Sequence, residues 1–237
     1  MNSLSSLSSL SSIKFPRDPN WLPTFQHAES RTWEMIENVK RETWFEGAIL
    51  SDVVELMPPD GVLFTASSLP VRHLDQFAPL RQDGIRSFAN RGASGIDGTV
   101  SSALGVASAS DQPLVLVIGD LAFYHDLNGL LAFARCGVRA TIVLINNNGG
   151  GLFRRLPIAQ FDPPFTDLFL TPHGLDFEPV VRMFGAGYSR VESREAFRKI
   201  FKASIGSDIP VVIEVHTDSA LHEQMRQEIA NLQISNP

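Results

Sequence analysis

The chain contains two short apolar runs separated by a stretch with helical spacing of its hydrophobic residues. The runs span residues 114–118 and 141–145, and the intervening helix is expected near 126–136. Apolar runs of this length are typical of fully buried strands. Because strands that alternate with helices form βαβ units, we predict an α/β fold of the Rossmann-like kind, with a parallel sheet flanked by helices on both faces.

The same alternation extends along most of the chain. Further strands are expected over 62–64, around Tyr188 and over 211–215. Loops are expected over 88–98 and about 149–173. In sheets of this kind, ligands bind beyond the carboxyl ends of the strands. The expected helices cover 29–40, 45–57, Ser67 to Leu74, 99–110, 177–184, 193–203 and a last segment after Ser219.

The composition excludes some classes of partner. The 237 residues are 43% hydrophobic and 19% charged, which is enough to bury a full core. The net charge of −6 argues against a nucleic-acid or anionic-membrane surface. No apolar run approaches the roughly 18–20 residues of a membrane span. The single cysteine, Cys136, excludes an intrachain disulfide, and we interpret it as a packed structural thiol.

The N-terminal residues differ from the rest of the chain. Residues 1–12 are an uncharged Ser/Leu repeat without the basic start of a secretory signal. A disordered leader is favoured, and a transit peptide stays open because the stretch is rich in Ser and free of acid. We expect a leader and an extended linker over 1–28, and an α/β domain with an N-terminal helical segment over 29–237. The predicted location is the cytoplasm, or an organelle if the leader is a transit peptide.

Oxygen-bearing groups follow both central apolar runs. Gly119-Asp120 follows the first, and residues 146–150, Asn-Asn-Asn-Gly-Gly, follow the second after an interval of 25 residues. Asp120 offers a carboxylate, Asn147 an amide oxygen and Gly149 a backbone carbonyl, which together suit Mg²⁺ that shares phosphate oxygens. The alternative is a plain turn, because Asn and Gly tolerate positive φ.

A second motif, over residues 90–98, reads Asn-Arg-Gly-Ala-Ser-Gly-Ile-Asp-Gly. Its three glycines let the backbone approach a ligand closely. Ser94 and backbone amides can donate hydrogen bonds to a phosphate, and Arg91 can bind a carboxylate through two parallel hydrogen bonds. The alternative is a structural turn with a solvated arginine.

These motifs carry a resemblance to a known family. Gly-Asp and Asn-Asn after successive strands resemble the signature of thiamine diphosphate enzymes, although Leu121 stands where the signature usually has a second glycine. More specifically, residues 45–225 resemble the C-terminal, diphosphate-binding part of 2-succinyl-5-enolpyruvyl-6-hydroxy-3-cyclohexene-1-carboxylate (SEPHCHC) synthases of menaquinone and phylloquinone biosynthesis. The matching strings are residues 68–72, 90–98, 119–128 and 146–153.

The resemblance implies a set of site residues. The expected ligands of Mg²⁺, or Mn²⁺, are Asp120, Asn147 and the carbonyl of Gly149. The expected contacts to thiamine diphosphate are Ser94, Gly95, Ile96, Gly119, Asp120, Leu121, Asn147 and Gly150. The expected contacts to substrate are Ser68, Arg72, Arg91, Leu152 and Phe153, of which the last two are equally consistent with plain core packing.

The resemblance also implies a reaction and a partner. Synthases of this family decarboxylate 2-oxoglutarate on thiamine diphosphate and add the product to isochorismate, and the cofactor supplies the nucleophile and the electron sink. A separate pyrimidine-binding domain supplies a glutamate that promotes ylid formation. Early glutamates such as Glu46 lie on helical patterns and follow no strand. We therefore assign no catalytic residue in this chain. We expect the chain to be inactive alone and to need a pyrimidine-binding domain or subunit, within a homo- or hetero-oligomer.

Several alternatives stay open at this point. The chain is interpreted as a fragment, one subunit of a split enzyme, or a non-catalytic thiamine diphosphate-binding module. The motifs are also consistent with another thiamine diphosphate carboligase or decarboxylase, or with an α/β domain that binds a different phosphorylated ligand. Arg154 and Arg155 are expected on the solvated surface. The roles of His125, His173 and His216 are open. A zinc site is not expected, because His27, His73 and His222 lack metal-ligand spacing.

Overall fold

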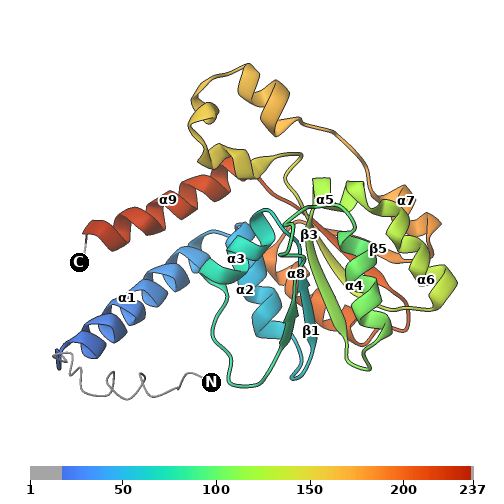
Figure 1. The fold of residues 1–237 in the computed structure, drawn as a ribbon, viewed down its shortest axis with the longest axis horizontal. Helices are drawn as coiled ribbons and strands as arrows, with labels where there is room; N and C mark the ends of the chain where they lie inside the picture. The colour runs from blue at the N-terminus through green and yellow to red at the C-terminus, as the bar shows by residue number, and fades with distance from the viewer. Residues whose placement is uncertain (1–17, 236–237) are drawn as a thin grey trace, which may run out of the picture.

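The computed structural model describes residues 18–235, with side chains described through residue 231 (Figure 1). The predicted leader over 1–12, and the linker as far as residue 17, lie outside the described residues. Within the described part, six parallel strands form one sheet in the order β2-β1-β3-β4-β6-β5, which confirms the predicted α/β fold. The strands are β1 (Val62–Thr65), β2 (Arg86–Phe88), β3 (Leu114–Gly119), β4 (Thr141–Asn146), β5 (Gly187–Val191) and β6 (Val211–His216).

Helices cover both faces of this sheet (Figure 1). Most lie within a few residues of their predicted positions, although the short strand β2 was not predicted. The expected helix near 126–136 is divided into η2 and α6, and the short helix α5 that precedes them was not predicted. The helical segments are α1 (Trp21–Glu42), α2 (Glu46–Leu56), α3 (Leu69–Phe77), α4 (Thr99–Ser108), α5 (Asp120–His125), η2 (Leu127–Leu130), α6 (Leu131–Cys136), α7 (Glu178–Met183), α8 (Arg194–Ile205) and α9 (Ser219–Ser235).

The central strands are apolar along their whole length because both of their faces are buried. In β3, Leu116 and Ile118 point into a core with α4, α5 and α7. Val115 and Val117 point to the opposite face, which packs on α2 and α8. Successive residues of a strand point to opposite faces, so one continuous apolar run fills both cores.

A third apolar cluster joins α1 and α9 to the domain through Ile36, Val39, Met225 and Ile229. Helix α1 begins at Trp21, so the expectation of an extended chain is wrong for residues 21–28. Pro23 lies in the first turn of that helix. Proline lacks an N–H group, and in the first turn such a group would have no intrahelical acceptor. The division of the chain into domains at residue 28 stays a prediction.

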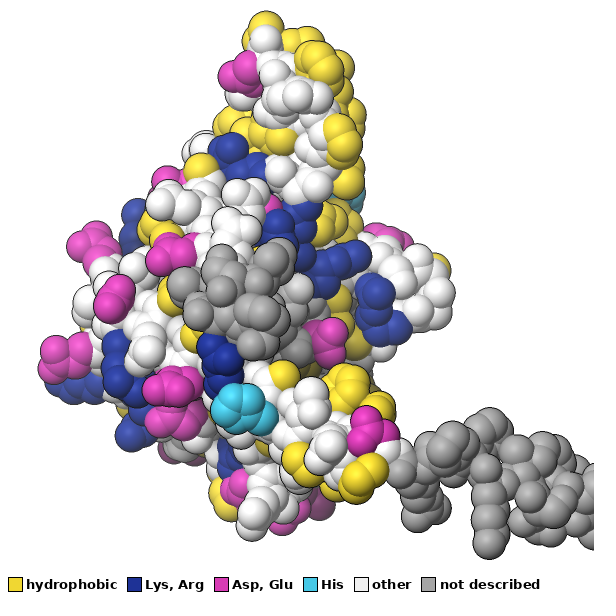
Figure 2. Space-filling model, turned by 90° about the vertical axis from the view of Figure 1, so that its left-hand side faces the viewer, with side chains coloured by type: hydrophobic (Ala, Val, Ile, Leu, Met, Phe, Trp, Pro, Cys, Tyr) yellow, Lys and Arg dark blue, Asp and Glu magenta, His cyan; other side chains and the backbone are white. Residues whose placement is uncertain are grey.

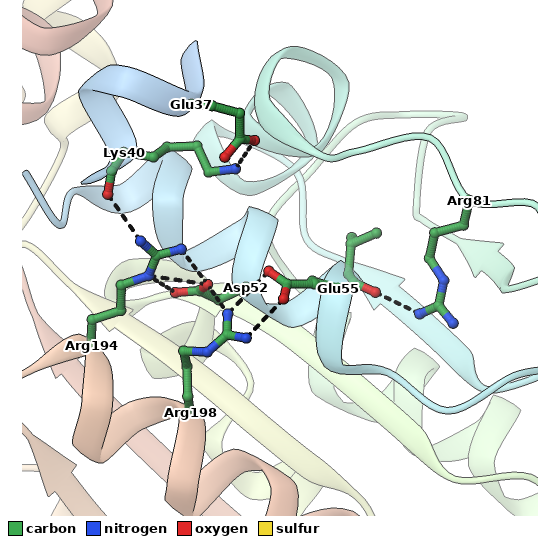
Figure 3. Close-up of polar contacts among 8 residues, drawn as sticks. Glu37, Lys40, Asp52, Glu55, Arg81, Arg194 and Arg198 are labelled. Carbon is green, nitrogen blue, oxygen red and sulfur yellow. Dashed lines mark hydrogen bonds and ion pairs between the residues drawn. The ribbon is translucent and has the colours of Figure 1, made fainter. Parts of the chain in front are cut away.

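A buried ionic cluster ties α2 to α8 (Figure 3). The Asp52 carboxylate is fully buried and accepts hydrogen bonds from Nε and Nη2 of Arg194, the shortest at 2.9 and 2.8 Å, and one from Arg198. Arg194 also donates to the carbonyl of Lys40 at 3.0 Å, at the end of α1. Arg198 donates to Glu55 at 2.8 Å. The cluster therefore sets how the N-terminal helices meet the sheet domain.

The segment between β4 and α7 projects from the domain beside the start of α9 (Figure 1). We expected a loop here, and the structure has short helical turns instead: η3 (Gly151–Arg155), η4 (Pro157–Gln160) and η5 (Thr166–Leu170), the last a π-helical turn. Figure 2 shows hydrophobic side chains gathered along one edge of this projection. Leu156, Phe161 and Leu168 are exposed there.

One prediction about a single residue is wrong. Cys136 is exposed at the end of α6, immediately before Gly137 in the left-handed conformation, and is not a packed structural thiol. The helix turns this position outward while Phe133 faces the core. Among residues 18–235, no helix combines the length and hydrophobicity needed to cross a lipid bilayer.

Candidate cofactor site

The candidate site forms where β3 and β4 end next to each other. Gly119 pairs with Ile145 in the parallel register, so Asp120 and the Asn146–Gly150 turn emerge side by side. Asp120 is 3% exposed, and its two oxygens accept hydrogen bonds from the backbone N–H groups of Leu121 at 2.7 Å and Gly149 at 3.0 Å. The carboxylate is thereby held against the turn that carries the other predicted metal ligands.

A cavity of about 260 Å³ opens at this edge of the sheet. It brings together segments that are far apart in the sequence, and of the predicted site residues only Gly95 does not line it. Gly95 lies between Ser94 and Ile96, which do. The predicted residues that line the cavity are Ser68, Arg72, Arg91, Ser94, Ile96, Gly119, Asp120, Leu121, Asn147, Gly149, Gly150, Leu152 and Phe153.

The donor set in the cavity fits a hard divalent cation. Oδ1 of Asn147 is buried and makes no hydrogen bond among the described residues, and a buried acceptor without a partner is costly unless something binds it. The Asp120 carboxylate and the Gly149 carbonyl supply two further oxygens close by. Oxygen ligands of these types, leaving room for phosphate and water, are what Mg²⁺ prefers.

The backbone around the cavity is held in unusual conformations. Ser68, Ser94 and Asn148 have φ of 75°, 59° and 60°, in the left-handed region that non-glycine residues rarely adopt. Gly149 has φ of 138°, and a Cβ atom there would lie 2.0 Å from the carbonyl oxygen of Leu170. Residues held in such conformations cluster at ligand-binding sites, where the surrounding structure fixes them.

Two exposed arginines border the cavity. Arg72 donates to the carbonyl of Ser68 at 2.6 Å, and Arg91 donates to the hydroxyl of Ser67 at 3.3 Å. Each hydrogen bond uses one nitrogen of a guanidinium group, which carries five N–H donors. The remaining donors are available to the carboxylates of a ligand.

Apolar residues complete the cavity wall. Ile96 is half-buried and packs against the core cluster that contains α4 and α5. Phe153 lies in η3 and meets Phe169 edge to face, with ring centroids 5.6 Å apart. Leu152 and Phe153 are half-buried. They therefore combine packing within the projection with exposure to the cavity.

A buried polar cluster next to Asn147 was missed by the sequence reasoning. Oε1 of Glu46 accepts hydrogen bonds from Asn147 Nδ2 and Thr217 Oγ1, both at 2.9 Å. Oε2 of Glu46 lies 3.8 Å from Nδ1 of His73, and His73 Nε2 lies 2.8 Å from His222 Nε2. These groups come from α2, α3, α9 and the end of β6. The sequence feature that could have indicated this cluster is a carboxylate near the start of the apolar stretch 44–50.

Burial controls the charges in this cluster. It raises the pKa of Glu46, against the opposing hydrogen bonds from Asn147 and Thr217. It lowers the pKa of His73 well below its usual value, and that of His222 to about 3. Both rings are therefore neutral near pH 7. The nearby Arg155 guanidinium adds to the effect on both histidines.

The cluster also has the composition of a metal site. Ligand atoms of Glu46, His73 and His222 lie within 4.8 Å of one another, and zinc uses such sets. However, the two rings already bond to each other, and Nη2 of Arg155 lies 3.4 Å from His222 Nε2. A guanidinium at this distance repels a cation, so we interpret the cluster as hydrogen-bonded support for Asn147.

The two consecutive arginines are not simply solvated, contrary to expectation. Arg155 lies 3.5 Å from Glu223 and contacts His222, with 17% of its side chain exposed. Arg154 donates to Ser219 at 2.7 Å. Both therefore fix η3 to the start of α9.

The three histidines whose roles were left open have different surroundings. His173 Nε2 lies 3.2 Å from Asp120 Oδ2, so this residue borders the candidate metal ligands. His216 lies 2.9 Å from the buried Glu214. His125 is exposed at the end of α5. Asp126 accepts hydrogen bonds from the N–H and hydroxyl groups of Ser101, near the start of α4.

Comparison with known proteins places this geometry in a family. The family model described as "Thiamine pyrophosphate enzyme, C-terminal TPP binding domain" matches residues 73–215. The SEPHCHC synthase of Roseiflexus castenholzii is 52% identical over 205 residues, which are 86% of this chain and 35% of the relative. That of Haloarcula marismortui is 46% identical over 215 residues, covering 89% and 36%. The chain thus spans about a third of the length of these relatives.

Solved structures share the fold. The benzoylformate decarboxylase of Polynucleobacter necessarius aligns with a TM-score of 0.61 and 21% identity, over 73% of this chain and 33% of that one. A thiamine diphosphate-dependent 4-hydroxybenzoylformate decarboxylase of Rhodococcus jostii aligns with a TM-score of 0.60 and 23% identity, over 73% and 32%.

The family match covers more than half of the chain and includes both strand ends that build the cavity. The resemblance to part of the SEPHCHC synthases, first suggested by four sequence strings, is confirmed by the identity to curated relatives. The chain therefore belongs to the thiamine pyrophosphate (TPP) enzymes, as a C-terminal TPP-binding domain.

Proposed function

We propose that this chain is the TPP- and Mg²⁺-binding part of a SEPHCHC synthase, which joins decarboxylated 2-oxoglutarate to isochorismate. The observation that carries the proposal is the convergence of Asp120, Asn147 and Gly149 on one cavity with Arg72 and Arg91. The identity to named SEPHCHC synthases over 86% of the chain supports the choice of reaction.

In this proposal the strand ends hold the diphosphate end of TPP. Oδ1 of Asn147, the Asp120 carboxylate and the Gly149 carbonyl bind Mg²⁺, or Mn²⁺ in its place, and the metal neutralises phosphate oxygens. Ser94 and Gly150 contact the cofactor from the two loops that border the cavity. When bound, TPP supplies the nucleophilic carbon and the electron sink for decarboxylation and carbon–carbon bond formation.

The arginines select anionic substrates. Both proposed substrates are carboxylates, and a guanidinium binds a carboxylate through two parallel, charge-assisted hydrogen bonds. Arg72 of α3 and Arg91 of the loop after β2 both line the cavity, and Ser68 lies directly before α3. Leu152 and Phe153 exclude water from the same space. These residues orient the substrates. Proton transfer at the cofactor ring is the role of the pyrimidine-binding domain.

A pyrimidine-binding domain completes the active site in this proposal. It is supplied by another segment or another chain, in a homo- or hetero-oligomer, and brings the glutamate that promotes ylid formation. The exposed Leu156, Phe161 and Leu168 of the projection support such a partner, because clustered exposed apolar side chains mark interaction surfaces. A cytoplasmic location remains part of the proposal.

The test is a reconstitution assay. The purified chain is mixed with a pyrimidine-binding domain taken from a SEPHCHC synthase, and product is measured with 2-oxoglutarate plus isochorismate, or with pyruvate. We expect no turnover alone, and turnover with the partner only for 2-oxoglutarate plus isochorismate. Turnover with pyruvate instead would assign a different carboligase or decarboxylase. Absence of turnover when the chain demonstrably binds both TPP and the partner would favour a non-catalytic module.

A further inference from the structure

Glu46 is a buried carboxylate with an uncommon position. It is the first residue of α2, is 1% exposed, and lies 101 residues before Asn147 in the sequence. Its Oε1 atom accepts from the amide nitrogen of Asn147 and from the hydroxyl of Thr217, both at 2.9 Å. A carboxylate in such a place is costly to bury unless it makes specific hydrogen bonds, so its partners indicate what it does.

The hydrogen bond from Asn147 to Glu46 determines which way the amide faces. An asparagine side chain has one donating and one accepting end. The carboxylate oxygen that also accepts from Thr217 can only accept from Asn147, so the NH₂ group must face Glu46. Oδ1 is left on the other side, buried and without a hydrogen-bond partner among the described residues. The amide therefore offers an unpaired oxygen to the cavity that Asn147 lines.

Close packing holds the amide in this orientation. A Cβ atom on Gly151 would lie 2.8 Å from Asn147 Nδ2 and 2.8 Å from the Cβ of Ser219. The glycine thus lets the turn pass close to the amide. Glu46 is itself backed by His73 and His222, which come from α3 and α9. Oε2 of Glu46 lies 3.8 Å from His73 Nδ1, and neither atom makes a hydrogen bond among the described residues.

We propose that Glu46 is a positioning residue that orients Asn147, so that Oδ1 faces the Mg²⁺ of bound TPP. The inference rests on the proposed Mg²⁺-binding role of Asn147. Groups that hydrogen-bond to metal ligands set the ligand orientation and contribute strongly to metal affinity. Without Glu46, the amide turns to pair its oxygen with protein or water, and the metal loses a preorganised ligand.

The test uses a double-mutant cycle on the full chain. The variants are Glu46→Ala, Asn147→Ala and the double variant, and the measurement is the Mg²⁺ concentration dependence of TPP binding by calorimetry. We expect Glu46→Ala to weaken Mg²⁺ affinity by about 10–100-fold and to add no further loss when Asn147 is already alanine. Independent, additive losses would overturn the proposal, because they show that Glu46 does not act through Asn147.

Conservative variants separate positioning from folding. Glu46→Gln keeps a carbonyl oxygen for Asn147 and Thr217 and is expected to recover most of the affinity. Thr217→Val removes the other hydrogen bond to Oε1 while leaving the amide contact, and is expected to stay within about threefold of the wild type. Glu46→Gln as weak as Glu46→Ala would contradict positioning, as would equal losses in Thr217→Val.

A second readout does not require cofactor binding. In the ligand-free chain, the side-chain NH₂ protons of Asn147 are observed by NMR, and their hydrogen exchange is compared between the wild type and Glu46→Gln or Glu46→Ala. We expect protected protons in the first two and exposed protons in the last. If the wild type binds no Mg²⁺ and TPP, the proposed function fails, while unprotected protons in the wild type would overturn the orientation itself.

Discussion

The Nε2 atom of His173 lies 3.2 Å from Oδ2 of Asp120, although the two residues come from distant parts of the sequence. Nδ1 of the same ring accepts from the backbone N–H of Leu175 at 3.0 Å, so in the neutral ring the proton is on Nε2, which is buried and makes no hydrogen bond among the described residues. The N–H groups of His173 and Gly174 also donate to Oδ1 of Asn148. The loop after the projection is thereby attached to both strand ends that build the site.

Replacing His173 therefore affects cofactor binding. We expect His173→Ala to weaken Mg²⁺-dependent TPP binding by about 10-fold, the lower end of the range for residues next to metal ligands, because Asp120 loses a close neighbour. The measurement is calorimetric titration at fixed Mg²⁺. His125→Ala is the matched control, since that ring is exposed at the end of α5, and it is expected to bind as the wild type does. Equal losses in both variants would refute a specific role for His173.

The Gly149 turn is expected to tolerate no side chain. In Gly149→Ala the new Cβ would lie 2.0 Å from the Leu170 carbonyl oxygen, in a backbone conformation with φ of 138°. We expect a loss of about 3 kcal/mol in the free energy of unfolding, measured in urea. Gly105→Ala in α4 is the control. A Cβ atom added at Gly105 would meet no other atom within 4 Å, so about 0.5–1 kcal/mol of stabilisation is expected.

The ionic cluster between α2 and α8 gives a third prediction. Asp52→Asn leaves Arg194 and Arg198 without their buried partner, and we expect a loss of about 3 kcal/mol in unfolding free energy. The two arginine side chains are 31% and 28% exposed, so partial hydration keeps the loss at the lower end of the usual range. Glu55→Gln, at an exposed partner of Arg198, is expected to cost less than about 1 kcal/mol. A larger effect at Glu55 would contradict the assignment of Asp52 as the central group.

The pH dependence of stability follows from His222. Burial lowers its pKa in the folded state to about 3, below the usual 6.5. The unfolded chain therefore binds a proton on this ring first as the pH falls. The contribution of His222 to stability is complete above about pH 6.5 and is lost progressively between there and pH 3. We expect His222→Gln to reduce the loss of stability between pH 7 and pH 4, relative to the wild type.

The control for this prediction is His27→Gln, because His27 is exposed in α1. Its substitution is expected to leave the slope of unfolding free energy against pH unchanged. Urea unfolding at several pH values measures both variants. A wild-type slope in His222→Gln would show that the buried ring is not a source of the acid sensitivity.

The sheet and the residues that line the cavity could be predicted from local sequence. The apolar runs 114–118 and 141–145 indicate buried strands because their composition leaves no solvent face, and Asp120 and Asn147 follow at their ends. The positions of Ser68 and Ser94 at the cavity could be predicted from the sequence strings that match the SEPHCHC synthases. Their left-handed conformations were not, since serine carries no local signal for positive φ.

The buried support of the site could not be predicted from one sequence. Glu46, His73 and His222 meet only after α2, α3 and α9 pack together, and no spacing between them encodes that contact. Arg155 was expected in solvent because a charged pair in a loop usually lies there, and the docking of η3 on α9 reverses this. The start of α1 was misjudged because Pro23 suggested extended chain, whereas proline is tolerated in a first helical turn.

The metal–diphosphate site at the ends of β3 and β4 is tested most directly by calorimetric titration of the full chain with TPP, in the presence and absence of Mg²⁺. We predict binding that requires Mg²⁺ and that is abolished in Asp120→Ala, while Glu55→Gln binds like the wild type. Binding of equal strength without Mg²⁺, or unchanged in Asp120→Ala, would contradict the assignment of these strand ends to a metal-bound diphosphate.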